Sequence, residues 1–377
     1  MRIEDWISRF HEAPLLVFWE STKACPLACK HCRADAILKP LPGELTTSEG
    51  KLLIEQVAAF GHPSPFLVIT GGDPLMRKDL FELIDYANSY GVPVAVSPAV
   101  SSNLSDEILN RLKEAGVRSI SISLDGATAE THEEMRQTPG NFGATVEAIS
   151  RAVKAGLVVQ VNTVIWRKNL RELPMIVKLI TDLGVRIWEV FFLIVTGRAV
   201  KELDITPQEY EDVVQFLVDV SRYGLQLRTV EAPFYRRAML ERANGAKYEG
   251  PLYNELVDRL HSLMGDPKRG PAQTITPTRD GFGIVFVSHN GIVYPSGFLP
   301  FPLGNIRVRN LVEIYRMHPL LVKMRQGLFT GRCGVCEYKS ICGGSRARAY
   351  AECGDPLATD PACIYEPSRS TMHSVSS

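Results

Sequence analysis

The sequence predicts an α/β fold in which helices cover a parallel sheet. Short apolar or β-branched runs alternate with amphipathic segments. The runs, which we predict to be strands, lie at 15–19, 66–70, 92–96, 117–124, 157–164 and 185–193. The amphipathic segments end at glycines, as helices commonly do, at Gly61, Gly91, Gly116, Gly156, Gly184 and Gly224. Near-continuous hydrophobicity in the strands and helical connections between them favour parallel pairing. Periodicity leaves an open doubly wound sheet and a curved partial barrel as alternatives.

Composition excludes several classes of protein. The 377 residues include 42 basic and 42 acidic side chains, so net charge gives no reason to expect nucleic-acid or anionic-membrane binding. No apolar run is long enough to span a bilayer, and Glu4, Asp5 and Arg9 stand where a signal peptide would be apolar. We therefore expect a cytoplasmic, reducing setting, in which eight cysteines indicate metal binding rather than disulfides.

The length predicts one large domain with a smaller one attached. We expect an N-terminal extension at 1–14 and the strand–helix region at 15–224. Prolines at 233, 251, 267, 271 and 277 indicate a bridging region at 225–280. A cysteine-rich domain would occupy 281–377 and begin with a β-hairpin turning at Asn290-Gly291.

Three thiols lie close together on the loop predicted after the first strand. Cys25, Cys29 and Cys32 form a C-x-x-x-C-x-x-C pattern. Cysteine thiolates hold Fe–S clusters and zinc, and three of them are one ligand short of a closed site, which leaves a metal position open. Zinc, a disulfide pair and three unrelated core cysteines are the alternatives.

Other motifs follow the predicted strands. Gly71-Gly72-Asp73-Pro74 follows the second strand, Asp125-Gly126 the fourth and Thr196-Gly197-Arg198 the sixth. Parallel α/β architectures assemble their sites at the carboxyl ends of strands, whether the sheet is open or closed. We therefore expect these motifs and the cysteine loop to share one edge of the sheet.

The cysteine loop, the Gly-Gly-Asp-Pro segment and Ser-Ile-Ser-Leu-Asp-Gly at 121–126 resemble the radical S-adenosylmethionine (radical SAM) superfamily over residues 15–199. The resemblance implies a partial (β/α)6 barrel, similar to an incomplete TIM barrel. It also implies a [4Fe–4S] cluster on Cys25, Cys29 and Cys32, whose fourth iron is chelated by SAM. Reductive cleavage of SAM would then give a 5′-deoxyadenosyl radical.

The resemblance also assigns cofactor contacts. It implies that Gly71, Gly72 and Asp73 meet the SAM amino group, although Glu is more usual than Asp there, and that Ser123 and Asp125 hold the ribose or methionine end. Arg136 would pair with the SAM carboxylate, and His31 would lie near the adenine, where backbone of the Thr196-Gly197-Arg198 segment could also reach. The ordinary alternatives are a tight turn for Gly71 and Gly72 and strand-end solvation for Ser123 and Asp125. Arg136 could equally be a helix-surface charge, and His31 an exposed loop residue.

A second group of cysteines lies near the C-terminus, at Cys333, Cys336, Cys342, Cys353 and Cys363. Such density indicates zinc or Fe–S binding, and the order of hairpin and cysteines resembles the SPASM domain of radical SAM proteins. The resemblance implies one auxiliary [4Fe–4S] cluster on Cys333, Cys336, Cys342 and Cys363. Cys353 would be a free thiol or an alternative ligand. Ser296 and Arg346 stand where ligands of a second auxiliary cluster would be, so we expect that cluster to be missing.

The chemistry implied is hydrogen abstraction from a substrate followed by electron transfer to the auxiliary cluster. We expect an oxidative modification of a tetrapyrrole, as in the haem and haem d1 branch of the superfamily. The alternatives are maturation of a ribosomally made peptide or protein, by crosslink or thioether formation, and a non-catalytic Fe–S or zinc protein. The family also implies an electron donor such as a flavodoxin or ferredoxin.

Overall fold

The computed structural model describes residues 3–267, 269–270 and 276–368. Parts of the predicted N-terminal extension, bridging region and C-terminal domain lie outside the described residues. The strands are β1 Leu16–Glu20, β2 Phe66–Thr70, β3 Val94–Val96, β4 Ser119–Ser123, β5 Val159–Ile165, β6 Ile187–Phe192, β7 Gln226–Val230, β8 Ile284–Val287, β9 Ile292–Tyr294 and β10 Gly304–Asn305.

Helices follow most of the parallel strands. They are α1 Ile3–Glu12, α2 Thr47–Ala58, α3 Leu80–Ser89, α4 Asp106–Glu114, α5 Ala129–Arg136, α6 Asn141–Lys154, α7 Leu173–Asp182, α8 Pro207–Val220, α9 Tyr235–Ala243, α10 Pro251–Met264, α11 Leu311–Met317, α12 Pro319–Arg325, α13 Gly331–Val335 and α14 Arg346–Cys353. None of the helices described is long and apolar enough to cross a membrane.

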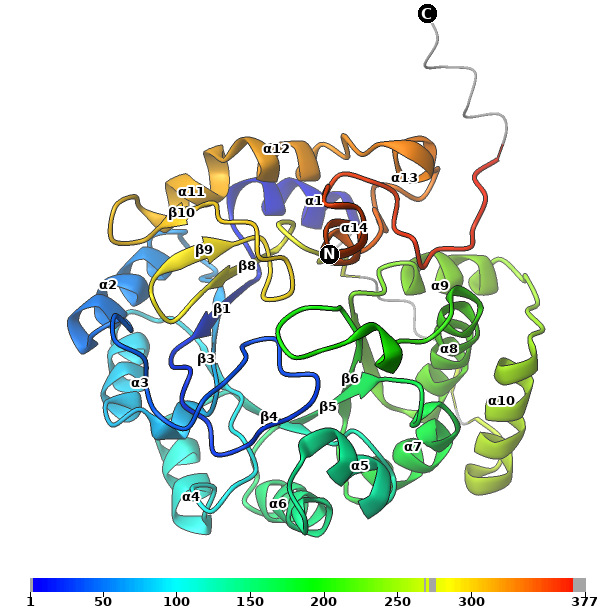
Figure 1. Cartoon of the computed structure of the whole chain (residues 1–377), viewed down its shortest axis with the longest axis horizontal. Coiled ribbons are helices and arrows are strands. Elements are labelled where there is room, and N and C mark those ends of the chain that lie inside the picture. Colours follow the sequence, from blue (N-terminus) through cyan, green and yellow to red (C-terminus); the bar gives the residue numbers. More distant parts are fainter. Residues whose placement is uncertain (1–2, 268, 271–275, 369–377) are drawn as a thin grey trace, which may run out of the picture.

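The strands form one curved sheet in the order β10-β9-β8-β1-β2-β3-β4-β5-β6-β7. Strands β1 to β7 pair in parallel, and helices surround the sheet on its outer side (Figure 1). The α/β fold with a partial barrel is therefore confirmed. All six of the predicted helix-terminal glycines have positive φ angles, which glycine adopts without steric strain.

The sheet extends beyond the six predicted strands on both sides. Strand β7 pairs with β6, but its residues are partly exposed and form no apolar run, so the hydrophobic pattern did not reveal it. On the other side, β8 pairs in parallel with β1, and the predicted hairpin is present as β8 and β9, with Gly291 in the turn at φ +83°. Consequently the C-terminal region continues the sheet of the barrel.

The C-terminal helices lie beside the start of the chain. Helix α1 packs against α11 and α12, and Tyr315 of α11 donates a hydrogen bond to the carbonyl of Phe10. Figure 1 shows α11 to α13 along one side of the barrel. Arg236 of α9 donates a hydrogen bond to the carbonyl of Ile341, and Glu231 after β7 accepts one from Ser345, so the segment around Cys342 lies next to α9 and the end of β7.

Candidate functional site

The cysteine loop leaves β1 at its carboxyl end. Cys25 and Cys29 are buried and Cys32 is partly buried, and all three are free thiols. Backbone N–H groups of Leu27 and Ala36 lie 3.4 and 3.5 Å from the Sγ atoms of Cys25 and Cys32. Burial raises the pKa of Cys25 to about 12, and the nearby Cys29 thiolate adds to this shift. Because N–H donors favour sulfur anions and a bound metal deprotonates its thiol ligands, this donor set fits an Fe–S cluster.

The segment after β6 holds the cysteine loop. Arg198 donates hydrogen bonds from its Nε to the carbonyl of Cys29 at 2.9 Å and from Nη1 to the carbonyl of Ala36 at 2.8 Å. A Cβ at Gly197 would lie 2.3 Å from the carbonyl oxygen of Cys32. The sequence predicted only a possible adenine contact for this segment, and its hold on the cysteine loop was not predicted because no local pattern shows which loop an arginine will reach.

The two glycines after β2 also meet the cysteine loop. A Cβ at Gly71 would lie 2.5 Å from the carbonyl oxygen of Thr22, and one at Gly72 would lie 2.2 Å from that of Ala24. The backbone N–H of Asp73 donates to the same Ala24 carbonyl at 2.6 Å. Only residues without a Cβ fit this close crossing of two loops.

The carboxylate of Asp73 is fully buried, and it points to the loop after β3. It accepts hydrogen bonds from the Leu75 and Ala99 backbone N–H groups and from the Ser101 and Asn103 side chains, at 3.1 to 3.4 Å. Burial raises its pKa, and the hydrogen bonds from Leu75 and Asn103 oppose that shift. The predicted contact with SAM remains a proposal.

Asp125 is the centre of a buried ionic cluster after β4. Its Oδ2 lies 2.7 Å from Nη2 of Arg136 and 3.2 Å from Nε2 of His31, and its Oδ1 accepts from the Val164 N–H. Arg136 also donates to Sγ of Cys29, at 3.7 Å. Although burial opposes ionisation of Asp125, Arg136 and His31 hold its pKa well below the usual range.

These contacts bring four of the predicted site residues together: His31, Asp125, Arg136 and Cys29. Ser123, also predicted, is a half-buried residue at the end of β4, and no hydrogen bond of its side chain is recorded among the described residues. The His31 and Arg136 side chains are only 11% and 12% exposed, so an exposed loop residue and a helix-surface charge do not describe them. Their roles toward SAM remain proposals.

Polar side chains on β5 to β7 form a network that was not predicted from the sequence. Gln160 donates to Oε2 of Glu189 at 2.8 Å and accepts from Nη1 of Arg228 at 3.1 Å. Burial raises the pKa of Glu189. The available signal was the presence of Gln160 and Glu189 within otherwise apolar runs, where a polar side chain needs a buried partner.

In the second group, four of the five cysteines lie near one another. The Sγ of Cys333 accepts from the Asp360 N–H at 3.4 Å, and that of Cys342 accepts from the Gly344 N–H at 3.5 Å. In addition to burial, a negative charge on Cys333 raises the pKa of the Cys336 and Cys342 thiols, and one on Cys342 raises the pKa of the Cys363 thiol. By contrast, Cys353 is exposed at the end of α14. This arrangement favours Cys363 over Cys353 as a ligand.

Within the residues described, no three His, Cys, Asp or Glu side chains form a group that could hold a metal ion. A cluster spreads its thiolates around several irons, so its ligands do not have to converge on one point.

A buried carboxyl pair, also absent from the predictions, lies beside the second group. Glu231, which follows β7, accepts a hydrogen bond from Ser345 at 2.5 Å and shares another with Asp280. Asp280 in turn accepts from the Arg346 and Ala347 N–H groups at the start of α14, both at 3.0 Å. Burial, with repulsion from Asp280, raises the pKa of Glu231 well above its usual value.

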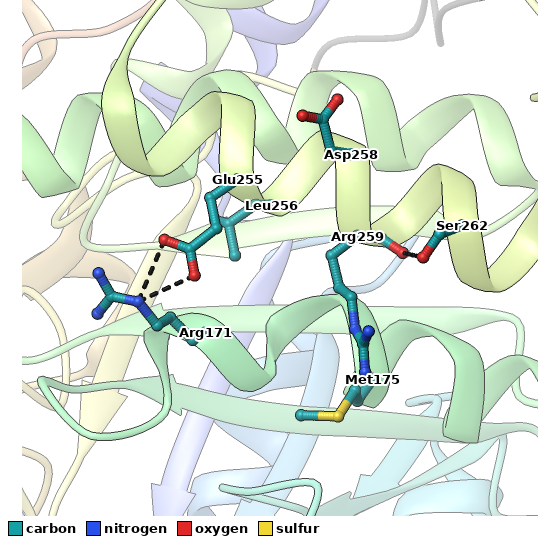
Figure 2. A pocket seen from close by; sticks show the side chains of 7 residues that line it. All are labelled: Arg171, Met175, Glu255, Leu256, Asp258, Arg259 and Ser262. Atoms are coloured by element: carbon teal, nitrogen blue, oxygen red, sulfur yellow. Dashed lines mark hydrogen bonds and ion pairs between the residues drawn. The ribbon is translucent and has the colours of Figure 1, made fainter.

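Two open surface pockets lie outside the predicted site. One, of about 600 Å³, lies between α7 and α10 and is lined by Arg171, Met175, Glu255, Leu256, Asp258, Arg259 and Ser262 (Figure 2). The other, of about 320 Å³, includes Arg237, Tyr248 and Tyr365 in its lining. Neither is lined by any predicted site residue.

Comparison with known proteins identifies relatives along nearly the whole chain. The sequence profile of the Radical SAM superfamily matches residues 19–180. The AdoMet-dependent heme synthase of Nitratidesulfovibrio vulgaris is 39% identical over 94% of this chain and 94% of its own length. The pre-heme d1 synthase of Dinoroseobacter shibae is 28% identical over 92% and 85%, and the mycofactocin maturase MftC of Mycobacterium tuberculosis is 28% identical over 96% and 86%.

Solved structures show the same fold. Streptococcus suis SuiB bound to precursor peptide SuiA has a TM-score of 0.68 at 14% identity, covering 94% of this chain and 76% of that one. Native anSMEcpe with bound AdoMet has a TM-score of 0.65 at 15% identity, covering 92% and 93%. With its sequence relatives and fold, this chain belongs to the radical SAM superfamily of enzymes, which use a [4Fe–4S] cluster and S-adenosylmethionine, and it is related to the haem-biosynthesis branch.

Proposed function

We propose that this protein is an oxidative radical SAM enzyme acting on a haem-like tetrapyrrole precursor. The observation that carries the proposal is the 39% identity to an AdoMet-dependent heme synthase, which extends over 94% of both chains. An alignment of that extent includes the barrel and most of the cysteine-rich region. The proposal therefore concerns the whole enzyme and not only its radical-generating part.

Cys25, Cys29 and Cys32 hold the first cluster in this proposal. The SAM contacts are Gly71, Gly72, Asp73, Ser123, Asp125, Arg136 and His31. When bound, the cluster and SAM supply a 5′-deoxyadenosyl radical able to abstract hydrogen from an unactivated carbon. The chain's own residues hold the cysteine loop in place: Arg198 binds a carbonyl of the loop, and Arg136 links Cys29 to Asp125. The open metal position is therefore held in a fixed environment.

The second cluster would be held by Cys333, Cys336, Cys342 and Cys363. Four protein thiolates close the coordination of a cluster, which suits electron transfer rather than direct binding of substrate. A site for one electron next to a radical-generating barrel supports an oxidative outcome. All eight cysteines are free, which supports the proposal of a reducing, cytoplasmic setting, and a flavodoxin or ferredoxin would supply the electron that starts each turnover.

The proposal is tested with anaerobically reconstituted protein. We expect roughly eight irons and eight sulfides per chain and 5′-deoxyadenosine on adding dithionite and SAM. Replacing Cys25, Cys29 and Cys32 together by Ala should leave about four irons and abolish 5′-deoxyadenosine. Bound zinc without 5′-deoxyadenosine formation would support the non-catalytic alternative and overturn the enzyme proposal.

A peptide substrate is the second candidate, because MftC, named a maturase, is 28% identical over 96% of this chain. The two candidates separate when a propionate-bearing iron tetrapyrrole and a candidate precursor peptide are each added to the loaded enzyme. We expect a mass change in the tetrapyrrole that matches the 5′-deoxyadenosine formed. A matching change in the peptide, with the tetrapyrrole unaltered, would replace our proposal by the second candidate.

A further inference from the structure

Three buried arginines lie at the second group of cysteines. Arg236 comes from α9, Arg279 precedes β8, and Arg346 begins α14. Arg236 and Arg279 are each 6% exposed, and Arg346 is fully buried. Nη2 of Arg346 lies 3.5 Å from Sγ of Cys333, and both Arg236 and Arg279 are attracted by charge on Cys342. Three segments far apart in the sequence thus bring positive charge to one place.

The hydrogen bonds of these arginines go mainly to uncharged backbone carbonyls. Arg236 donates to the carbonyls of Thr276, Thr278 and Ile341. Arg279 donates to the carbonyl of Ser340 at 3.1 Å. The recorded bonds of Arg346, other than the one to Cys333, go to the carbonyls of Gly344, Pro356 and Ala358. A carbonyl oxygen accepts a hydrogen bond but carries no full negative charge, so these contacts do not neutralise the three guanidinium groups, and Nε of Arg279 is buried without a hydrogen-bond partner among the described residues.

In the described part of the chain, none of the three arginines forms an ion pair with a carboxylate, whereas their neighbours do. Arg237 pairs with Glu211 and Glu241, and Arg348 pairs with Asp360. Asp280 attracts Arg279 without forming an ion pair with it, because its carboxylate binds the start of α14, and Glu231 binds Ser345. Burying an unpaired charge is strongly unfavourable, so such groups are normally accompanied by an opposite charge.

The difficulty of burying these charges appears in their proton affinities. Burial lowers the pKa of Arg279 to about 9, and repulsion from Arg236 and Arg346 lowers it further, while Cys342 and Asp280 oppose the shift. Burial also lowers the pKa of Arg236 to about 10, against the attraction of Cys342. Their positions show where an opposite charge would lie: Arg346 contacts Sγ of Cys333, and Arg236 and Arg279 bind the carbonyls of Ile341 and Ser340, next to Cys342.

We infer that Arg236, Arg279 and Arg346 are the built-in counter-charge of an anionic cluster on Cys333, Cys336, Cys342 and Cys363, and that they raise its reduction potential. The inference rests on the auxiliary cluster of the proposed function. Four thiolates outweigh the positive core of a [4Fe–4S] cluster, and one-electron reduction adds one more negative charge. Because fixed positive charges in a poorly solvated site stabilise the more negative state most, they favour reduction.

A raised potential matches the role proposed for this cluster. Hydrogen abstraction leaves one unpaired electron on the substrate, and its transfer oxidises the substrate and reduces the cluster by one electron. Such an acceptor works best when its reduced state is stabilised. The arginines are therefore positioning residues for electron acceptance, and they act through the cluster without touching the substrate.

The test uses the full chain with Cys25, Cys29 and Cys32 replaced by Ala, so that only the second cluster is observed. Its potential is measured by a redox titration followed by electron paramagnetic resonance. We expect Arg279→Met to lower the reduction equilibrium constant about tenfold, a shift of about 59 mV for one electron. Arg236→Met should also lower the potential. Arg279→Lys, which keeps the charge, should have a potential close to that of the parent.

Arg325→Met is the matched control. Arg325 is also 6% exposed, and it donates hydrogen bonds to the backbone carbonyls of Tyr315 and Arg316. No cysteine contributes to the shift of its pKa. Its replacement should leave the potential unchanged. Equal potentials for Arg279→Met and Arg325→Met, with iron bound in both, would overturn the inference. Absence of iron in the parent variant would instead overturn the auxiliary cluster itself.

A second measurement decides the case of a variant that does not load iron. Without the cluster the three positive charges lose their counter-charge, so we expect Arg279→Met to raise the melting temperature of the iron-free protein. Arg325→Met, which removes a buried side chain remote from the cysteines, should lower it. A decrease for both variants would mean that Arg279 is only structural and would contradict the inference.

Discussion

Oδ2 of Asp125 lies 2.7 Å from Nη2 of Arg136, and the other terminal nitrogen of the same guanidinium lies 3.7 Å from Sγ of Cys29. The carboxylate is completely buried and the arginine side chain is 12% exposed. A single arginine therefore joins the loop after β4 to the first cysteine group. The contact connects two motifs that are about a hundred residues apart in the sequence.

Removing Arg136 should leave the buried Asp125 carboxylate without its closest positive charge, with His31 as its remaining ionisable partner. We expect Arg136→Met to lower the free energy of unfolding by about 3–5 kcal/mol, the usual cost of breaking a buried ion pair. Asp125→Asn keeps an oxygen that can accept from the Val164 N–H, so the double variant should be more stable than the sum of the two single losses implies. Urea denaturation of the four proteins measures this coupling, and additive losses would contradict it.

Cys363 and Cys353 provide a matched test of the second cluster. In the variant lacking Cys25, Cys29 and Cys32, we expect Cys363→Ser to reduce bound iron from about four atoms to almost none, because a cluster ligand is lost. Cys353→Ser should retain the iron, since that thiol is exposed at the end of α14. Iron analysis of both proteins is sufficient, and the reverse pattern would assign the ligand to Cys353.

Gly197 should be needed for the shape of the first cysteine loop. A Cβ there would lie 2.3 Å from the carbonyl of Cys32 and 2.6 Å from that of Arg33, so Gly197→Ala must displace the loop. We expect the variant to lose most of the iron of the first cluster and its SAM cleavage. Gly61→Ala is the control, because Gly61 also has a positive φ but nothing lies within 4 Å of its Cβ position. Equal iron losses in the two variants would mean that only backbone strain matters.

The Glu231 carboxyl should make stability fall as pH rises. Its folded-state pKa is raised well above 4.5, so the folded protein retains a proton that the unfolded chain releases. This contribution is complete below the unfolded pKa and is lost as pH rises toward the folded pKa. Glu231→Gln, which keeps an acceptor for Ser345, should remove that dependence. The melting temperature of the variant relative to the parent should therefore increase from pH 5 to pH 8, and a constant difference would contradict the assignment.

The sequence by itself determined the local parts of this protein. Spacing placed Cys25, Cys29 and Cys32 on one loop, strand-end motifs placed Asp73 and Asp125 at one edge, and apolar runs predicted six of the parallel strands. These features depend on residues close together in the chain, where periodicity and turn chemistry act directly. They were sufficient for the superfamily and for the partial barrel.

Only the tertiary structure decided which distant groups meet. It placed Cys363 and not Cys353 beside Cys342, brought Arg198 onto the cysteine loop, and gathered Arg236 and Arg279 from separate segments. An arginine has the same local pattern whether it faces water or a buried thiol, because its surroundings are set by the path of the whole backbone. Burial without a carboxylate partner, which gives the arginines at the second cysteine group their significance, is therefore a property of the fold alone.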